Sequence, residues 1–218
     1  MKTWQLPIRP EALIFDLDST LYTNPAYARF QTEVLIERLA AFRGEPLGVT
    51  RALISNLRAE RKSRGEADTS LGNLFLSLGI PIETSVAWRE ELIDPHRWLH
   101  ADARLAASLA ALAERLPLCL VTNNPRSVGL GSLEALGVAS SFSFVIGLDD
   151  SLRSKPDPAP FRLALSRLGR DASSTLSIGD REDVDIRPAL DLGMGAILVE
   201  SVEEIHSLQS LLFSLRNP

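Results

Sequence analysis

The sequence lacks several features that would assign the protein to a specialised class. Only one cysteine, Cys119, occurs in 218 residues, so no internal disulfide can form, which agrees with a reducing compartment. Cys119 lies in an apolar run at 118–121, where a small buried hydrophobic side chain is a better interpretation than a reactive thiol. No apolar run approaches the roughly 18 residues of a membrane span.

Basic residues are also fewer than acidic residues. The 23 lysines and arginines face 28 acidic residues, which gives a net charge of −5 and argues against a nucleic-acid polymer or an anionic membrane as partner. The first seven residues lack the apolar segment of a signal peptide. We therefore expect a cytoplasmic protein, and nothing in the sequence demands more than a monomer or a weak dimer.

The residues that are present describe an ordinary globular chain with a large core. Hydrophobic residues make up 45% and charged residues 23%, as in typical globular domains. A chain of this length suits one substantial domain, or a core with a smaller insert.

Strands and helices alternate in most of the chain. Short apolar runs without alternation predict buried strands at 12–15, 118–121, 142–148, 175–178 and 196–199. Helical patterns lie between and after them, near 102–115, 126–136, 158–168, 184–192 and 202–215. Five strands with helical crossovers predict an α/β fold with a mainly parallel, doubly wound sheet.

One block interrupts this alternation. Residues 21–97 contain helical patterns only, at about 26–42, 48–64, 69–78 and 83–93. A helical block that directly follows the first strand predicts a small all-helical domain, 21–97, inserted into a core made of 1–20 and 98–218. Pro95 and Trp98 indicate that the second linker is stiff or packed.

The first predicted strand ends in two carboxylates, Asp16 and Asp18. Buried carboxylates at this place are unfavourable unless they are paired or bound to a cation, and ligands bind at the carboxyl ends of the strands in open α/β sheets. The two side chains lean to the same side of an extended chain. One can act as a nucleophile and the other can transfer protons, with a metal ion reducing their repulsion.

Three later strands are also followed by polar side chains. Thr122 and Asn123 close the second core strand, where a hydroxyl and backbone amides can bind a phosphate oxygen. Lys155 follows the third strand and precedes two restrictive prolines, Pro156 and Pro158, and a lysine there can neutralise both a nucleophile and a phosphate. Taken alone, Thr122 is explained equally well by strand and turn propensities, and Lys155 by a surface turn.

The fourth strand ends in Gly179 followed by an acidic segment that contains Asp180 and Asp185. The glycine permits a close approach of the backbone. Magnesium prefers a few carboxylates together with water and a substrate phosphate. Glu182 and Asp183 are explained by the preference of acidic residues for helix N-termini, and their role stays open.

These four segments together resemble the motifs of the haloacid dehalogenase-like hydrolase superfamily, in its phosphatase branch with a helical cap after the first motif. The matching segments are Asp16–Thr20 (DxDxT), Thr122, Lys155–Pro158 and Gly179–Asp185 (GDxxxxD), in this order along the chain. The resemblance implies a Rossmann-like three-layer core with a five-stranded, mainly parallel sheet. It also implies a magnesium-dependent phosphoric monoester hydrolase that acts on a small phosphorylated metabolite.

The resemblance also implies a role for each matching residue. Asp16 is the nucleophile that forms an aspartyl phosphate, and Asp18 is the general acid and base. Thr122, Asn123 and Lys155 bind the substrate phosphate. The Mg²⁺ ligands are Asp16, the main-chain carbonyl of Asp18, Asp180, and Asp185 directly or through water.

The substrate and the reaction type leave alternatives. Tyr22 and Tyr27 can stack on a base or pack the insert, and Leu21-Tyr22 after Thr20 is similar to nucleotidase-like members. A 5′-nucleotidase and a phosphoglycolate-type phosphatase are therefore both open. A phosphomutase is disfavoured, because mutase-like members usually carry glycine at the position of Thr20. A non-catalytic binding protein is disfavoured because all expected catalytic residues are present.

Overall fold

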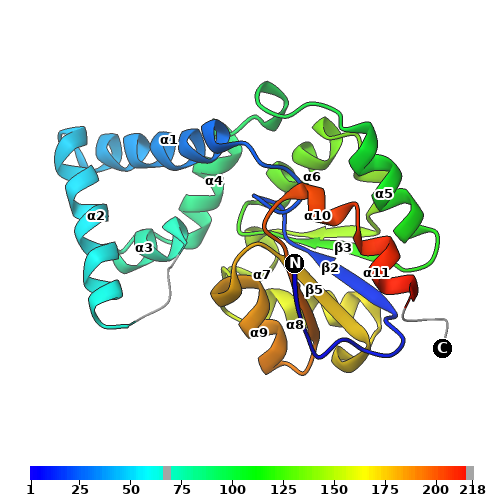
Figure 1. The fold of residues 1–218 in the computed structure, drawn as a ribbon. Coiled ribbons are helices and arrows are strands. Elements are labelled where there is room, and N and C mark those ends of the chain that lie inside the picture. Colours follow the sequence, from blue (N-terminus) through cyan, green and yellow to red (C-terminus); the bar gives the residue numbers. More distant parts are fainter. Residues whose placement is uncertain (66–69, 215–218) are drawn as a thin grey trace.

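The computed structural model describes residues 1–65 and 70–214 (Figure 1). The helix ends expected at 69 and 215 lie outside these residues. Within the described residues, no helix is both long and apolar enough to cross a membrane.

The centre of the fold is a six-stranded sheet in the order β1-β6-β5-β2-β3-β4. Its strands are β1 (Lys2–Trp4), β2 (Ala12–Phe15), β3 (Leu118–Val121), β4 (Phe144–Ile146), β5 (Thr175–Gly179) and β6 (Gly195–Leu198). Strands β2 to β6 are parallel, as predicted, and β1 adds an antiparallel edge against β6. The pattern did not predict β1, because this strand has only three residues, of which two are exposed, and they carry no periodic signal.

Helices cover both faces of this sheet, so the predicted three-layer α/β architecture is confirmed. The central strand β2 is buried along its whole length: Leu13 and Phe15 point into one apolar cluster, and Ile14 points into the other. The first cluster lies under α5 (Ala103–Ala113), α6 (Arg126–Ala135), α10 (Val202–Ile205) and α11 (Leu208–Ser214), and the second under α8 (Ala159–Leu168) and α9 (Arg187–Asp191). Burial on both faces explains why the strand sequences show no alternation.

The topology places β2 at the point where the strand order reverses. The chain runs from β2 to β3 and β4 on one side, and then to β5 and β6 on the other. Crevices at such switch points, beyond the carboxyl ends of the strands, are the ligand sites of open α/β sheets. Asp16 and Asp18 follow β2 directly at this point.

Between β2 and β3, the regular elements of the described residues are all helices, as expected. They include α1 (Pro25–Arg43), α2 (Leu47–Ser63), α3 (Leu71–Ser77) and α4 (Ile82–Leu92), followed by a 3₁₀ turn at Pro95–Arg97. These helices stand to one side of the sheet (Figure 1). We call α1 to α4 the helical insert.

Two core helices differ from the periodic prediction. The segment predicted as a helix at 184–192 is a π-helical turn, Glu182–Ile186, that continues into α9. The segment predicted at 202–215 is divided into α10 and α11, and the structure adds a short helix, α7 (Leu148–Ser151). A period of 3.6 residues does not distinguish a π turn from an α turn over so few residues.

The linkers between the insert and the core are packed against each other. The Trp98 ring stacks on Tyr27, at 5.8 Å between centroids and 18° between planes, and on Phe30, at 4.8 Å and 28°. The Asn24 side chain donates a hydrogen bond to the Trp98 carbonyl at 2.9 Å. The expectation of a packed second linker is therefore confirmed.

Replacing Trp98 with alanine removes both stacked contacts, and we expect the free energy of unfolding to fall by about 2–4 kcal/mol. The measurement is chemical denaturation followed by circular dichroism. Ile8→Ala is the matched control, because Ile8 is 84% exposed and a change there should stay within about 0.5 kcal/mol. Equal stability of Trp98→Ala and the wild type would contradict the packed linker.

Candidate active site

A buried lysine joins two of the four motif segments. The Lys155 ammonium lies 2.6 Å from Oδ1 of Asp16 and 2.6 Å from Oδ1 of Asp185, and the Lys155 side chain is 2% exposed. Thr20 adds a hydrogen bond from its hydroxyl to Oδ2 of Asp16 at 3.2 Å. Both oxygens of the Asp16 carboxylate are therefore fixed at the end of β2.

A glycine and the π-helical turn bring Asp185 to this lysine. A Cβ at Gly179 would lie 2.4 Å from Cβ of Asp185 and 2.6 Å from its Cγ, so only glycine leaves room for the carboxylate. The Ser177 hydroxyl donates to the Asp185 carbonyl at 2.9 Å, and the Arg181 backbone amide donates to Oδ2 of Asp185 at 3.2 Å. The close backbone approach expected at Gly179 is confirmed.

Three donors from both parts of the molecule hold the second carboxylate, Asp18. Its Oδ1 accepts hydrogen bonds from the Tyr22 hydroxyl and from Gln31 Nε2, the latter at 2.9 Å. Its Oδ2 accepts from Asn124 Nδ2 at 3.1 Å, and Asn124 Nδ2 also donates to Gln31 Oε1 at 3.0 Å. Asp18 therefore has a fixed orientation that depends on α1 and on the loop after β3.

The surroundings of Asp18 favour its neutral form, whereas those of Lys155 favour its charged form. Burial, followed by the charge of Asp16, raises the pKa of the Asp18 carboxyl, against the hydrogen bonds from Tyr22 and Gln31. Burial disfavours the charged Lys155, but Asp16 and Asp185 outweigh burial and raise the pKa of the ammonium. Lys155 thus stays charged, and the Asp18 carboxyl holds a proton more readily than an exposed carboxyl does.

The two predicted phosphate ligands after β3 have partners within the protein. The Thr122 hydroxyl oxygen accepts a hydrogen bond from the Asn124 amide at 3.1 Å. The Asn123 side chain donates to the Lys155 carbonyl at 3.1 Å and accepts from the Lys155 amide at 2.7 Å. Asn123 therefore positions the backbone of Lys155, and its contact with phosphate stays a prediction.

Asp16, Asp180 and Asp185 form the acidic cluster that the sequence predicted for the metal. One carboxylate oxygen from each lies within 4.8 Å of the other two. Burial, followed by the charges of Asp16 and Asp185, raises the pKa of Asp180 to about 7. Hard oxygen ligands in such a cluster fit Mg²⁺. Glu182 instead pairs with Arg187 at 3.5 Å, outside the cluster.

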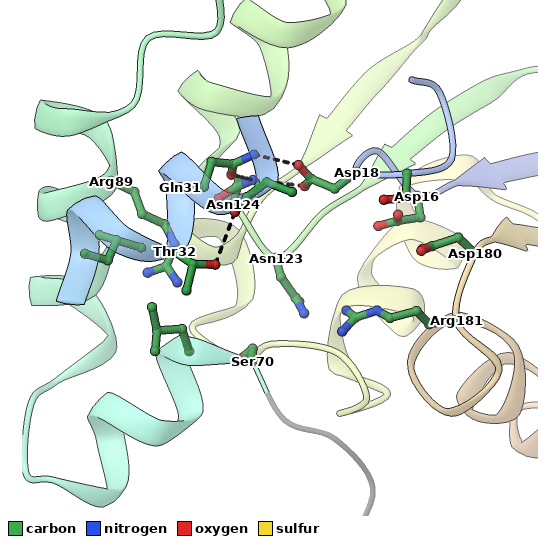
Figure 2. A pocket seen from close by; sticks show the side chains of 14 residues that line it. Asp16, Asp18, Gln31, Thr32, Ser70, Arg89, Asn123, Asn124, Asp180 and Arg181 are labelled. Atoms are coloured by element: carbon green, nitrogen blue, oxygen red, sulfur yellow. Dashed lines mark hydrogen bonds between the residues drawn. The ribbon is translucent and has the colours of Figure 1, made fainter. Parts of the chain in front are cut away.

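Asp16, Asp18 and Asp180 line a cavity of about 300 Å³ between the core and the helical insert. Figure 2 shows Asp16, Asp18 and Asp180 along one side of it and Arg89, from α4, on the other. The insert and the core also meet beside the site, because Ser154 donates to the Asn73 side chain at 3.0 Å and its hydroxyl lies 2.8 Å from that of Ser70.

Sequence reasoning did not find the contributions of Gln31, Arg89 and Arg181 to this cavity. One signal was available for Arg89, because Ile82, Val86, Arg89 and Ile93 share one face at helical spacing and the arginine interrupts an apolar stripe. Gln31 and Arg181 have no such signal, since polar residues at those positions are equally typical of solvent-facing surfaces.

The two tyrosines that left a choice between stacking and packing are buried. Tyr22 is 7% and Tyr27 is 0% exposed, and their rings lie 5.9 Å apart. Tyr27 stacks on Trp98, whereas Tyr22 bonds Asp18. Neither ring is available to a nucleotide base, so packing of the insert is the role that their contacts support.

Replacing Asp180 with asparagine should stabilise the metal-free protein at alkaline pH. The pKa of Asp180 is raised from 3.8 to about 7, so its ionisation lowers the free energy of unfolding progressively between these two pH values. With a chelator present, we expect Asp180→Asn to melt above the wild type at pH 8, by a smaller margin at pH 5. Differential scanning fluorimetry measures this.

The control is Glu182→Gln, which removes a charge from an exposed pair and should leave the melting temperature nearly unchanged. A melting temperature of Asp180→Asn below that of the wild type at pH 8 would contradict this prediction. It would show that the Asp180 carboxylate stabilises the fold despite the repulsion within the cluster.

Comparison with known proteins agrees with this geometry. The model of the haloacid dehalogenase-like hydrolases matches residues 10–193. A phosphoglycolate phosphatase from Pectobacterium atrosepticum is 30% identical over 194 residues, which cover 85% of this chain and 78% of that protein. The predicted enzyme class, a phosphoric monoester hydrolase, is confirmed by this family and its phosphatase relatives.

Solved structures share the fold at lower identity. A HAD phosphatase from Thermococcus onnurineus superimposes with a TM-score of 0.64 at 20% identity, covering 93% of this chain and 97% of its own. A 2-haloacid dehalogenase from Pseudomonas syringae pv. Tomato DC3000 gives 0.59 at 22% identity, covering 94% and 99%. The match of fold, together with the family model over most of the chain, shows that the chain belongs to the haloacid dehalogenase-like hydrolases.

Proposed function

We propose that the protein is a magnesium-dependent phosphatase that hydrolyses a small organic phosphate monoester through a phosphorylated Asp16. The observation that carries this proposal is the pair of carboxylates after β2. Asp16 is held by Lys155 and Thr20, and Asp18, two residues further on, has a raised pKa. A fixed nucleophile beside a carboxyl that can hold a proton is what two-step phosphoryl transfer needs.

In the first step, a carboxylate oxygen of Asp16 attacks phosphorus and the bond from phosphorus to the ester oxygen breaks. The leaving oxygen takes the proton of Asp18 and departs as the alcohol. Asp18 is thereby ionised, and the hydrogen bonds from Tyr22, Gln31 and Asn124 stabilise the resulting carboxylate.

In the second step, ionised Asp18 removes a proton from a water molecule that attacks the aspartyl phosphate. The bond between phosphorus and the Asp16 oxygen breaks, inorganic phosphate leaves, and both aspartates return to their initial states. A dehalogenase does not need this acid and base, so Asp18 supports phosphoryl transfer over the dehalogenase chemistry of a fold neighbour.

The other predicted residues would bind the phosphate and the metal. Lys155 lies beside Asp16, and Thr122 lies at the end of β3. We propose that these two residues and Asn123 bind phosphate oxygens. Asp16, Asp180, Asp185 and the Asp18 carbonyl would hold Mg²⁺, which when bound supplies positive charge that stabilises the transferring phosphoryl group. The residues fit this ion, because three carboxylates and one ammonium leave an excess of negative charge.

The helical insert is proposed to act as a cap domain, spanning 21–97, over a core of 1–20 and 98–218. Its residues Gln31 and Arg89 line the cavity, so closure of the insert would complete the site and exclude water. A cavity of about 300 Å³ suits a small phosphorylated metabolite rather than a phosphoprotein. A cytoplasmic location and a monomeric or weakly dimeric state stay predictions.

The two substrate alternatives now differ in support. Burial of Tyr22 and Tyr27 leaves no ring to stack on a base, so a 5′-nucleotidase is supported only by the similarity of Leu21-Tyr22 to nucleotidase-like members. Relatives named phosphoglycolate phosphatase support the phosphoglycolate-type alternative.

Replacing Asp16 with asparagine should abolish the hydrolysis of p-nitrophenyl phosphate, by at least about 1,000-fold in kcat, because the amide is not a nucleophile. A chelator should abolish wild-type hydrolysis, and added Mg²⁺ should restore it. Release of p-nitrophenolate measures both effects.

Circular dichroism must show that Asp16→Asn is folded. Asp102→Asn is a suitable control, since Asp102 caps α5 away from the cavity. Asparagine caps a helix about as well as aspartate, so this change should leave both stability and kcat nearly unaltered. Undiminished turnover by the folded Asp16→Asn protein would overturn the proposed mechanism.

A further inference from the structure

Arg89 is an unusual residue because its charge is buried without an ion pair to any acidic side chain in residues 1–65 and 70–214. It is 5% exposed and is the only buried arginine among the residues that the structure describes. Ion pairs of other arginines in those residues, such as Arg51 with Glu33 and Arg104 with Glu203, lie at exposed positions. A buried charge without a counterion is unfavourable, so Arg89 calls for an explanation.

The hydrogen bonds of Arg89 do not join elements of the fold. Its Nη1 donates to the Ser85 carbonyl at 3.1 Å and to the Ser85 hydroxyl, and Ser85 lies one turn earlier on the same helix, α4. Within residues 1–65 and 70–214, no bond is found for Nη2 or Nε. The two contacts therefore orient the guanidinium but do not tie α4 to the core.

The guanidinium faces the catalytic cavity. Arg89 lines the same cavity as Asp16 and Asp18, and it stands across from them in Figure 2. Burial lowers the pKa of Arg89 to about 10, against the attraction of Asp18, so the side chain is charged at neutral pH. A planar cation with free donors at this place is suited to bind a carboxylate through paired hydrogen bonds.

We propose that Arg89 binds a second anionic group of the substrate, a carboxylate on the leaving group, and so selects phosphate monoesters of small hydroxy acids. The inference rests on the proposed phosphatase function and adds its specificity residue. The phosphate lies at Asp16 and Lys155, and the acid group of the same small molecule reaches Arg89 across the cavity. The substrate then supplies a counterion that the described part of the chain does not.

Two substrates that differ only at that group provide the test. Phosphoglycolate carries a carboxylate where ethyl phosphate carries a methyl group, and both have the same ester linkage. We expect the wild type to prefer phosphoglycolate in kcat/KM. Arg89→Met should lower kcat/KM for phosphoglycolate by about 100-fold, and for ethyl phosphate by less than about 3-fold.

Two further variants separate charge, geometry and fold. Arg89→Lys keeps the charge but loses the planar fork, so it should retain more phosphoglycolate activity than Arg89→Met. Arg38→Met removes a charge from the insert outside the cavity, where Arg38 pairs with Glu91, and should change neither substrate by more than about 3-fold. Arg89→Met should melt no lower than the wild type, because it removes an unpaired buried charge.

The results that would contradict the specificity differ from those that would contradict the phosphatase function. An equal loss for both substrates in Arg89→Met, with a lower melting temperature, would assign Arg89 to the fold and overturn the proposal. Unchanged kcat/KM for phosphoglycolate would overturn it as well. A wild type that hydrolyses p-nitrophenyl phosphate but shows no preference for phosphoglycolate would overturn the specificity alone. A wild type that hydrolyses none of the three would overturn the phosphatase function itself.

Discussion

The site depends on one buried ammonium group held between two carboxylates. Lys155 bonds Asp16 and Asp185 at 2.6 Å each, and it thereby joins segments that follow β2, β4 and β5 in the chain. The charge of the lysine permits three carboxylates to cluster at the end of a buried sheet, where they would otherwise repel one another. Gly179 and Asn123 serve this arrangement, since the first leaves room for Asp185 and the second fixes the backbone of Lys155.

The two aspartates after β2 are held by different parts of the molecule, and this separates their roles. Asp16 is held by residues of the α/β core, whereas Asp18 also depends on Gln31 from the helical insert. The position of the insert can therefore affect the proposed acid–base group, Asp18, while the proposed nucleophile, Asp16, stays fixed. The same insert brings Arg89 to the far side of the cavity, so the proposed proton transfer and the proposed choice of leaving group both depend on the helical insert.

The sequence was sufficient to predict the elements with a clear hydrophobic pattern and the charged residues at the ends of strands. Buried strands such as β2 produce unbroken apolar runs, and helices of the insert produce a clear period, so the α/β core and the inserted block were predictable. The acidic cluster was predicted from acidic residues at two strand ends together with the resemblance to the family motifs. The edge strand β1 and the π turn at Glu182–Ile186 have no distinct period. The partners of Asp18 arise from tertiary contacts between Gln31 and Asn124, 93 residues apart, which local patterns do not contain.

The central claim is that Asp16 carries the phosphoryl group and that Asp18 releases it. The most direct measurement is a rapid-mixing experiment with Asp18→Asn and p-nitrophenyl phosphate, whose leaving group departs without a proton. The account predicts a burst of about one equivalent of p-nitrophenolate per site followed by slow turnover. It also predicts phosphate on the peptide that contains Asp16, found by mass spectrometry after acid quenching. A phosphorylated residue other than Asp16, or turnover without a burst and without any phosphorylated peptide, would contradict the account.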